Sequence, residues 1–194
     1  MIFYILFLLP LVSGQWGTPP PIVTNEQCQV EYKSIMNCVR NPRLFTRIDE
    51  IPRPEKSENL ALIEEVTHVL DCSGFLNCNS SRILQSYLFN QRWILDVLHG
   101  KLEPCLGNGV LRKIFDSCDP APSYKNFKKF DDDDCNRITV YLPCFVNELK
   151  NQPTCKISDV NLFKRMIFAM RSGCVMGHQM KIEFDNYGII ENSF

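Results

Sequence analysis

The sequence predicts an all-α fold, a disulfide-stapled bundle of five or six helices with little or no sheet. Three observations support this prediction. Apolar residues recur at the spacing of amphipathic helices along most of the chain, whereas the strict alternation of strands is scarce. Ten cysteines all lie beyond residue 27. An apolar leader precedes them, as in proteins that form disulfides outside the cytosol.

Residues 2–12 form an apolar run that is too short to cross a membrane, which needs roughly 20 residues. The run matches the apolar core of a secretory signal, and small or compact residues follow it. We therefore expect residues 1–14 to be a signal peptide cleaved after Gly14, with cleavage after Ser13 as the alternative. Residues 15–23 contain three consecutive prolines, which favour an extended spacer.

Two helices are predicted before the segment 72–78. Thr24 and Gln27 have the spacing of a capping box, so the first helix should begin there. Pro42 should end that helix, because the residue before a proline avoids the helical conformation. Ser57 is a favourable N-cap for the second helix. The apolar residues at helical spacing in these two helices are Tyr32, Ile35, Met36, Val39, Leu60, Ile63, Val66, Val69 and Leu70.

A long helix is predicted after this segment, from about Ser81 to Leu98. Gly100 is placed to cap its end. Pro104 should open a short helix, because a proline is tolerated in the first helical turn. The apolar residues at helical spacing in this part of the chain are Leu84, Tyr87, Leu88, Ile94, Leu95, Leu98, Leu111, Ile114 and Phe115.

The helical pattern resumes at Asp133 and continues to about Leu149. Pro143 should kink this helix, because its missing N–H removes one backbone hydrogen bond. Ser158 should cap a last helix that ends near Arg171. Residues further on, at 181–184, alternate weakly and are expected to form a short strand or a plain tail.

The cysteine-rich helical domain is therefore expected to cover residues 24–176, followed by a C-terminal tail at 177–194. Hydrophobic residues make up 45% of the chain and the net charge is −1, which argues against a disordered chain and a basic nucleic-acid binder. No later apolar run is long enough to span a bilayer, so no membrane span is expected in the mature chain.

Helix geometry limits how the cysteines can pair. If Cys28 and Cys38 share one helix, they lie roughly 15 Å apart, whereas a disulfide requires Cα atoms within about 7 Å. Cys135 and Cys144 are excluded as a pair for the same reason unless Pro143 breaks their helix. The disulfides should therefore join different helices, although the full connectivity stays open.

Zinc is an alternative use of cysteines, but structural zinc sites favour C-x-x-C pairs, and none is present. Cys72 and Cys78 can pair with each other only if Gly74 turns the chain sharply. We expect disulfides and no metal or other cofactor. The predicted disulfide residues are Cys28, Cys38, Cys72, Cys78, Cys105, Cys118, Cys135, Cys144, Cys155 and Cys174.

The cysteines also stand in a recognisable order. It includes Cys72-Ser-Gly-Phe-Leu-Asn-Cys78, Pro104-Cys105 and Phe115-Asp-Ser-Cys118. From Cys28 to Cys174 the chain resembles the nematode secreted family called domain of unknown function 19. The resemblance implies a secreted helical module with no established activity, and it supplies no catalytic residue.

Catalytic motifs are absent from the sequence: it contains neither a G-x-S-x-G elbow nor an H-E-x-x-H pair. His68 is expected to be structural, His99 to lie near a helix end, and His178 to face solvent. No catalytic residue is predicted. The carboxylate pairs that a hydrolase would use are Glu64 with Glu65 and Glu183 with Asp185.

Two local motifs carry separate predictions. Residues 131–134 are four consecutive aspartates, which lack the spacing of an EF-hand and are interpreted as acids at a helix start rather than a calcium site. Asn79-Ser80-Ser81 is an N-glycosylation sequon, and Asn79 is the predicted glycosylation site.

These observations predict a secreted, extracellular interaction or binding module of unknown specific function. Its partner is expected to be an extracellular protein or a small apolar ligand, and not nucleic acid. Two alternatives stay open. Phenylalanines and methionines on helix faces would suit an apolar-ligand carrier, and the three histidines with the carboxylate pairs would suit a secreted hydrolase with a dispersed site.

Overall fold

The predicted all-α class is confirmed. The described residues are mainly helical and contain no strand, and disulfides join the helices. The signal peptide predicted at 1–14 and nearly all of the spacer lie outside the described residues. The computed structural model describes residues 23–45, 48, 56–107, 109–118 and 132–186.

The helices differ widely in length, and α9 is the longest. A π-helical turn, η1, directly continues α4. In chain order the elements are α1 (Asn25–Asn37), α2 (Pro42–Phe45), α3 (Lys56–Ser73), α4 (Asn79–Asp96), η1 (Val97–Lys101), α5 (Glu103–Leu106), α6 (Val110–Cys118), α7 (Asp132–Val140), α8 (Leu142–Lys150) and α9 (Ile157–Asn186).

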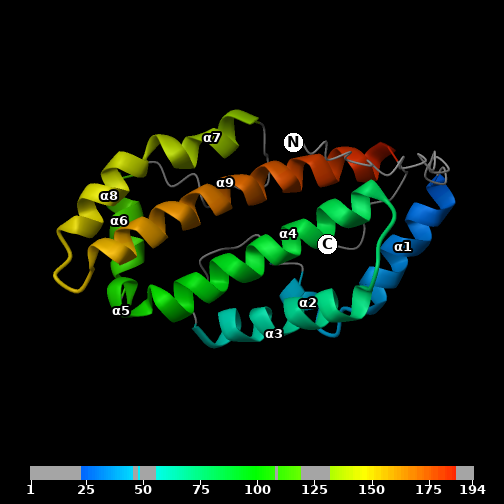
Figure 1. Cartoon of the computed structure of the whole chain (residues 1–194), viewed down its shortest axis with the longest axis horizontal. Coiled ribbons are helices and arrows are strands. Elements are labelled where there is room, and N and C mark those ends of the chain that lie inside the picture. The colour runs from blue at the N-terminus through cyan, green and yellow to red at the C-terminus, as the bar shows by residue number, and fades with distance from the viewer. Residues whose placement is uncertain (1–22, 46–47, 49–55, 108, 119–131, 187–194) are drawn as a thin grey trace, which may run out of the picture.

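Figure 1 shows α3, α4, α9 and the α7–α8 pair lying side by side. The first helix, α1, lies across one end of this layer, and α5 and α6 lie at the other end. The core runs between neighbouring helices rather than around a single axis. The largest side chains buried to below 2% exposure are Phe45, Phe145, Phe163, Ile35, Leu62, Leu84, Leu88, Ile94, Leu95, Leu102, Ile114 and Leu149.

The central contact is between α4 and α9, which run antiparallel. Asn79 at the start of α4 donates to Glu183 near the end of α9, at 2.9 Å. Asn90, further along α4, donates to the carbonyl of Ala169, also at 2.9 Å. Gly173 lets the two helices approach closely, because a Cβ atom there would lie 2.7 Å from the Asn90 amide nitrogen.

Five disulfides use all ten cysteines, and each joins residues of two different helices or of the segments that flank them. Cys28 does not pair with Cys38, nor Cys135 with Cys144, nor Cys72 with Cys78. The observed pairs are Cys28–Cys78, Cys38–Cys72, Cys105–Cys155, Cys118–Cys144 and Cys135–Cys174.

The predicted capping box at the first helix is confirmed. The Thr24 hydroxyl accepts from the Gln27 N–H at 3.2 Å, and the Gln27 side chain accepts from the Thr24 N–H at 2.9 Å. A buried carboxylate fixes the turn that follows α1. Glu65 on α3 accepts from the N–H groups of Arg40 and Asn41, at 2.6 and 3.0 Å.

The single kinked helix predicted after Asp133 is instead two helices, α7 and α8. The break falls at Tyr141, two residues before Pro143. Pro143 occupies the first turn of α8, where its missing N–H needs no helical partner. The proline therefore begins a new helix rather than bending a continuous one.

The last helix extends far beyond its predicted end near Arg171. Residues 177–186 of the predicted tail, including the segment expected as a strand or plain tail, belong to α9. The helix continues because its last turns are packed. Phe184 is buried against Tyr32 of α1, with the ring centroids 4.9 Å apart.

Three smaller predictions about helix ends were wrong. Ser57 and Ser158 are each the second residue of a helix, not the cap before it. Gly100 lies within the π-helical turn instead of ending α4. In each case the helix begins earlier, or continues further, than local sequence signals indicate.

Candidate interaction site

The turn between α3 and α4, residues 74–77, is here called the Phe75 loop. A disulfide anchors the chain on each side of it. Cys72 before the loop is bonded to Cys38, and Cys78 after it is bonded to Cys28. Gly74 has a φ of 64°, a left-handed conformation that glycine adopts without strain. The loop therefore leaves α3 sharply and is held at both ends.

A carboxylate from α1 fixes the far side of the Phe75 loop. Glu31 accepts from the N–H of Asn77 at 2.9 Å and from the N–H of Cys78 at 3.0 Å. Burial acts to raise the pKa of the Glu31 carboxyl, but these two backbone donors lower it, and the resulting pKa lies below its usual value. The anionic form is thus the one that holds the loop.

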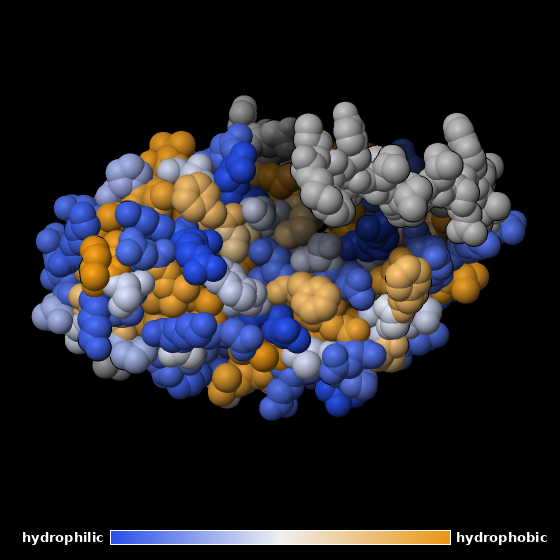
Figure 2. Space-filling model, viewed as in Figure 1, coloured by the Kyte–Doolittle hydropathy of each residue, from blue (hydrophilic) through white to orange (hydrophobic). Residues whose placement is uncertain are grey.

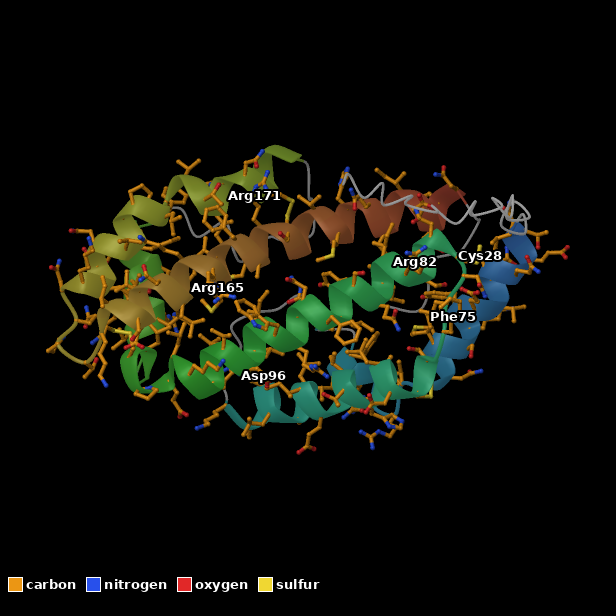
Figure 3. The ribbon with its side chains drawn as sticks, viewed as in Figure 1. Cys28, Phe75, Arg82, Asp96, Arg165 and Arg171 are labelled. Carbon is orange, nitrogen blue, oxygen red and sulfur yellow. A yellow bond between two sulfur atoms is a disulfide. The ribbon has the colours of Figure 1, made fainter. Side chains whose placement is uncertain are left out.

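The two apolar residues of the loop point in opposite directions. Leu76 is buried and pins the loop to the core, whereas the side chain of Phe75 is 89% exposed. Figure 3 shows Phe75 at the end of the molecule where Cys28 and Arg82 also lie. A large aromatic ring is therefore presented to solvent on a backbone that disulfides, a buried leucine and a carboxylate hold in place.

Two further exposed apolar residues belong to the segments that meet at this end. Val30 of α1 is next to Glu31 and is 67% exposed. Ile182 of α9 is next to Glu183, whose carboxylate accepts from Asn79, and is 49% exposed. Phe75 is the most exposed of the three.

The other exposed aromatic residues lie in different surroundings. Phe89 on α4 is partly covered by the guanidinium of Arg92, which lies 5.5 Å from the ring centroid. Phe168 lies on α9 and is 53% exposed. On the face seen in Figure 2, hydrophilic and hydrophobic residues are intermixed over α3, α4 and α9. That face therefore resembles an ordinary solvated surface more than a broad apolar docking patch.

The three histidines lie on three different elements. His68 is on α3, His99 is in η1 and His178 is on α9. The Nε2 atom of His99 is buried, and no hydrogen-bond partner reaches it within the described part of the chain. Burial lowers the pKa of His99; Glu103 acts against this shift, whereas Lys56 adds to it.

Two of the four carboxylates considered for a hydrolase, Glu65 and Glu183, have structural partners. Glu65 holds the turn after α1, and Glu183 accepts from Asn79. Among the described residues, no group of three or more histidine, cysteine, aspartate or glutamate side chains could hold a metal ion. Of the aspartate run, residue 131 and the side chains of 132–134 lie outside the description, and α7 begins at Asp132.

Asn79, the predicted glycosylation site, is the first residue of α4 and is exposed. It directly follows Cys78, which is disulfide-bonded to Cys28.

No helix in the described part of the chain has both the length and the apolar character needed to cross a bilayer. Comparison of the chain with protein-family models, with curated proteins and with solved structures found no match.

The Phe75 loop was not singled out as a site from the sequence. The sequence contained one signal: an aromatic residue, Phe75, directly follows a glycine in the short segment between Cys72 and Cys78. That pattern does not show whether Phe75 or Leu76 faces outward. The direction depends on the disulfide partners and on Glu31, which are remote in sequence.

Proposed function

We propose that this chain is a secreted, disulfide-braced helical module that binds an extracellular protein through the Phe75 loop. The predicted signal peptide supports secretion, and five disulfides suit an oxidising compartment. The observation that carries the proposal is the 89% exposure of Phe75 on a loop anchored at both ends. The resemblance to the domain of unknown function 19 family is likewise a proposal.

Rigid presentation favours binding, because little conformational entropy is left to lose. A flexible loop is ordered on association at a cost of about 0.5–1.5 kcal/mol for each immobilised side chain. The backbone of the Phe75 loop is already held by Cys72, Cys78, Leu76 and Glu31. Burying the phenylalanine ring in a partner then contributes roughly 1.5–3 kcal/mol.

The expected partner surface is an apolar pocket with a polar rim. Binding energy in interfaces concentrates in a few buried anchors, and aromatic residues are frequent among them. Val30 and Ile182 would add apolar contacts at the edge of such a pocket, because both are exposed and each is next in sequence to a glutamate that binds Asn77 or Asn79. Arg82, which is exposed on the first turns of α4, favours an acidic group on the rim.

The binding role is tested with a matched pair of variants, Phe75→Ala and Phe89→Ala. Each protein is immobilised after circular dichroism has shown that it is folded, and extracellular fluid is passed over it. The wild type and Phe89→Ala should retain the same protein partner, whereas Phe75→Ala should lose it at least tenfold. Equal retention by Phe75→Ala, or no retained protein at all, would overturn the proposal.

Secretion is tested separately with the full chain and its own leader. Expression in a eukaryotic host should release a protein whose first residue is Gln15, or Gly14 if the alternative site is used. N-terminal sequencing of the protein in the medium identifies the cleavage point. A chain that stays inside the cells with residues 1–14 attached would contradict the secretory part of the proposal.

A further inference from the structure

The sequon Asn79-Ser80-Ser81 is divided between the surface and the interior. Asn79 is exposed, and its Nδ2 atom donates to the Oε1 atom of Glu183 at 2.9 Å. Ser80 and Ser81 each have an exposure of 0%. The acceptor amide is therefore at the surface of the folded protein, while the serine hydroxyl that completes the sequon is inside it.

The sequon is also adjacent to a covalent constraint. Cys78 immediately precedes Asn79, is 1% exposed, and is bonded to Cys28 of α1. Its N–H is held by Glu31. Once this disulfide has closed and α4 has packed, Ser81 is inaccessible to an enzyme that must recognise its hydroxyl.

We propose that Asn79 carries an N-linked glycan, and that the glycan is transferred before the Cys28–Cys78 disulfide closes. The donor is a lipid-linked oligosaccharide diphosphate. The Asn79 amide nitrogen forms a bond to the anomeric carbon of the first sugar and loses one proton. The bond between that carbon and the diphosphate oxygen breaks, and the lipid diphosphate leaves.

The folded protein accommodates the product. The Asn79 side chain is at the surface, so the sugar extends into solvent without displacing core residues. A substituted amide keeps one N–H, which suffices for the hydrogen bond to Glu183. The glycan would therefore lie at the same end of the molecule as the Phe75 loop. It would leave the contact between α4 and α9 intact.

Glycosylation of Asn79 depends on one part of the proposed function, entry into the secretory pathway, and not on binding through Phe75. The first test removes that dependence, because the chain from Gln15 onward is expressed behind a heterologous secretion signal. Treatment with a peptide N-glycosidase should reduce the mass of the secreted wild type by one glycan and convert Asn79 to aspartate. Asn79→Gln and Ser81→Ala should show no mass change. A wild type without a glycan would overturn the assignment, whatever the result for Phe75.

The second test addresses the order of events. Unglycosylated protein from an oxidising bacterial compartment is incubated with solubilised oligosaccharyltransferase and its donor. The native protein should not be modified, whereas the reduced and alkylated chain should be modified at Asn79. Equal modification of the two forms would overturn the proposed order, and modification of neither would overturn Asn79 as an acceptor.

A matched pair of double variants identifies which disulfide prevents glycosylation of Asn79 in the folded protein. Cys28→Ala with Cys78→Ala removes the bond beside the sequon, and Cys105→Ala with Cys155→Ala removes a remote bond of the same 50-residue separation. Without reduction, only the first variant should be modified. If both variants or neither of them are modified, the Cys28–Cys78 bond does not control the site.

Discussion

Single polar side chains hold the connections between helices in this fold. Glu65 on α3 binds the turn after α1, Glu31 on α1 binds the Phe75 loop, and Asn90 on α4 binds α9. Glu65 and Glu31 satisfy backbone N–H groups in turns, where no helical partner exists, and a buried backbone group left without a partner costs roughly 1–3 kcal/mol. Asn90 instead adds a side-chain bond to a carbonyl within α9. His99 differs from these three, because its buried Nε2 atom gains no such bond from the described residues.

His99 should make the stability depend on pH. Its pKa is lower in the folded protein than in the unfolded chain, so the unfolded chain binds more protons in the range below about pH 6.5. The free energy of unfolding should therefore fall as the pH drops through and below that value. Urea unfolding with the disulfides intact should show a smaller fall between pH 7.5 and 5 for His99→Gln than for the wild type.

A second variant connects this effect to the neighbouring charges. Lys56 adds to the lowering of the His99 pKa, and it also pairs with Glu103. Lys56→Met should therefore weaken the pH dependence while His99 is still present. If neither variant changes the slope of stability against pH, His99 is not the group responsible.

At the scale of elements, the sequence predicted helices well and their ends less well. The capping box at Thr24 located the start of α1, because both of its bonds are local. The end of α9 could not be predicted this way, because Phe184 is kept helical by packing on Tyr32, about 150 residues earlier in the chain. The Phe75 loop was missed for the same reason, since its direction depends on remote disulfide partners.

The contact between α4 and α9 gives a prediction for two glycines on one helix. At Gly173 a Cβ would lie 2.7 Å from the side-chain amide nitrogen of Asn90, which donates a hydrogen bond to the carbonyl of Ala169. Gly173→Ala should destabilise the protein by about 1–2 kcal/mol, because overpacking and the lost hydrogen bond outweigh the gain in helix propensity. Thermal unfolding of the oxidised protein measures this change.

Gly177 is the matched control, because it lies one turn further along the same helix. A Cβ there would meet the Tyr87 ring at 3.9 Å, which is ordinary van der Waals contact. Gly177→Ala should therefore stabilise the protein by roughly 0.5–1 kcal/mol through helix propensity alone. Similar effects of the two substitutions would mean that the close approach at Gly173 does not matter.

At the scale of the whole molecule, the disulfides form two separate groups. Four cysteines before α4 pair with one another, and six from α5 onward pair with one another. The disulfides span 26 to 50 residues, so each stabilises the fold by about 3–4 kcal/mol in the chain-entropy account. The two groups are then joined by the chain itself and by non-covalent contacts, mainly the packing of α4 on α9 and of Phe184 on Tyr32.

Cleavage at Trp93 tests this division. The chain has one other tryptophan, Trp16, which precedes all the cysteines. Chemical cleavage after tryptophan in the denatured, unreduced protein should give a short N-terminal peptide without cysteine and two cysteine-containing fragments, with the four early cysteines in one and the six late cysteines in the other. They should separate on a gel without reductant. Fragments that stay together until reduction would show a disulfide between the groups.

Phe75 is the proposed contact residue of a rigid, disulfide-held loop, and crosslinking from its position tests this role directly. A photoreactive benzoylphenylalanine is placed at position 75 in one protein and, as the control, at position 89 in another. Irradiation in extracellular fluid should crosslink position 75 to one protein partner, the same partner that Phe75→Ala fails to retain. Crosslinking at position 89 alone, or none at position 75, would contradict the claim.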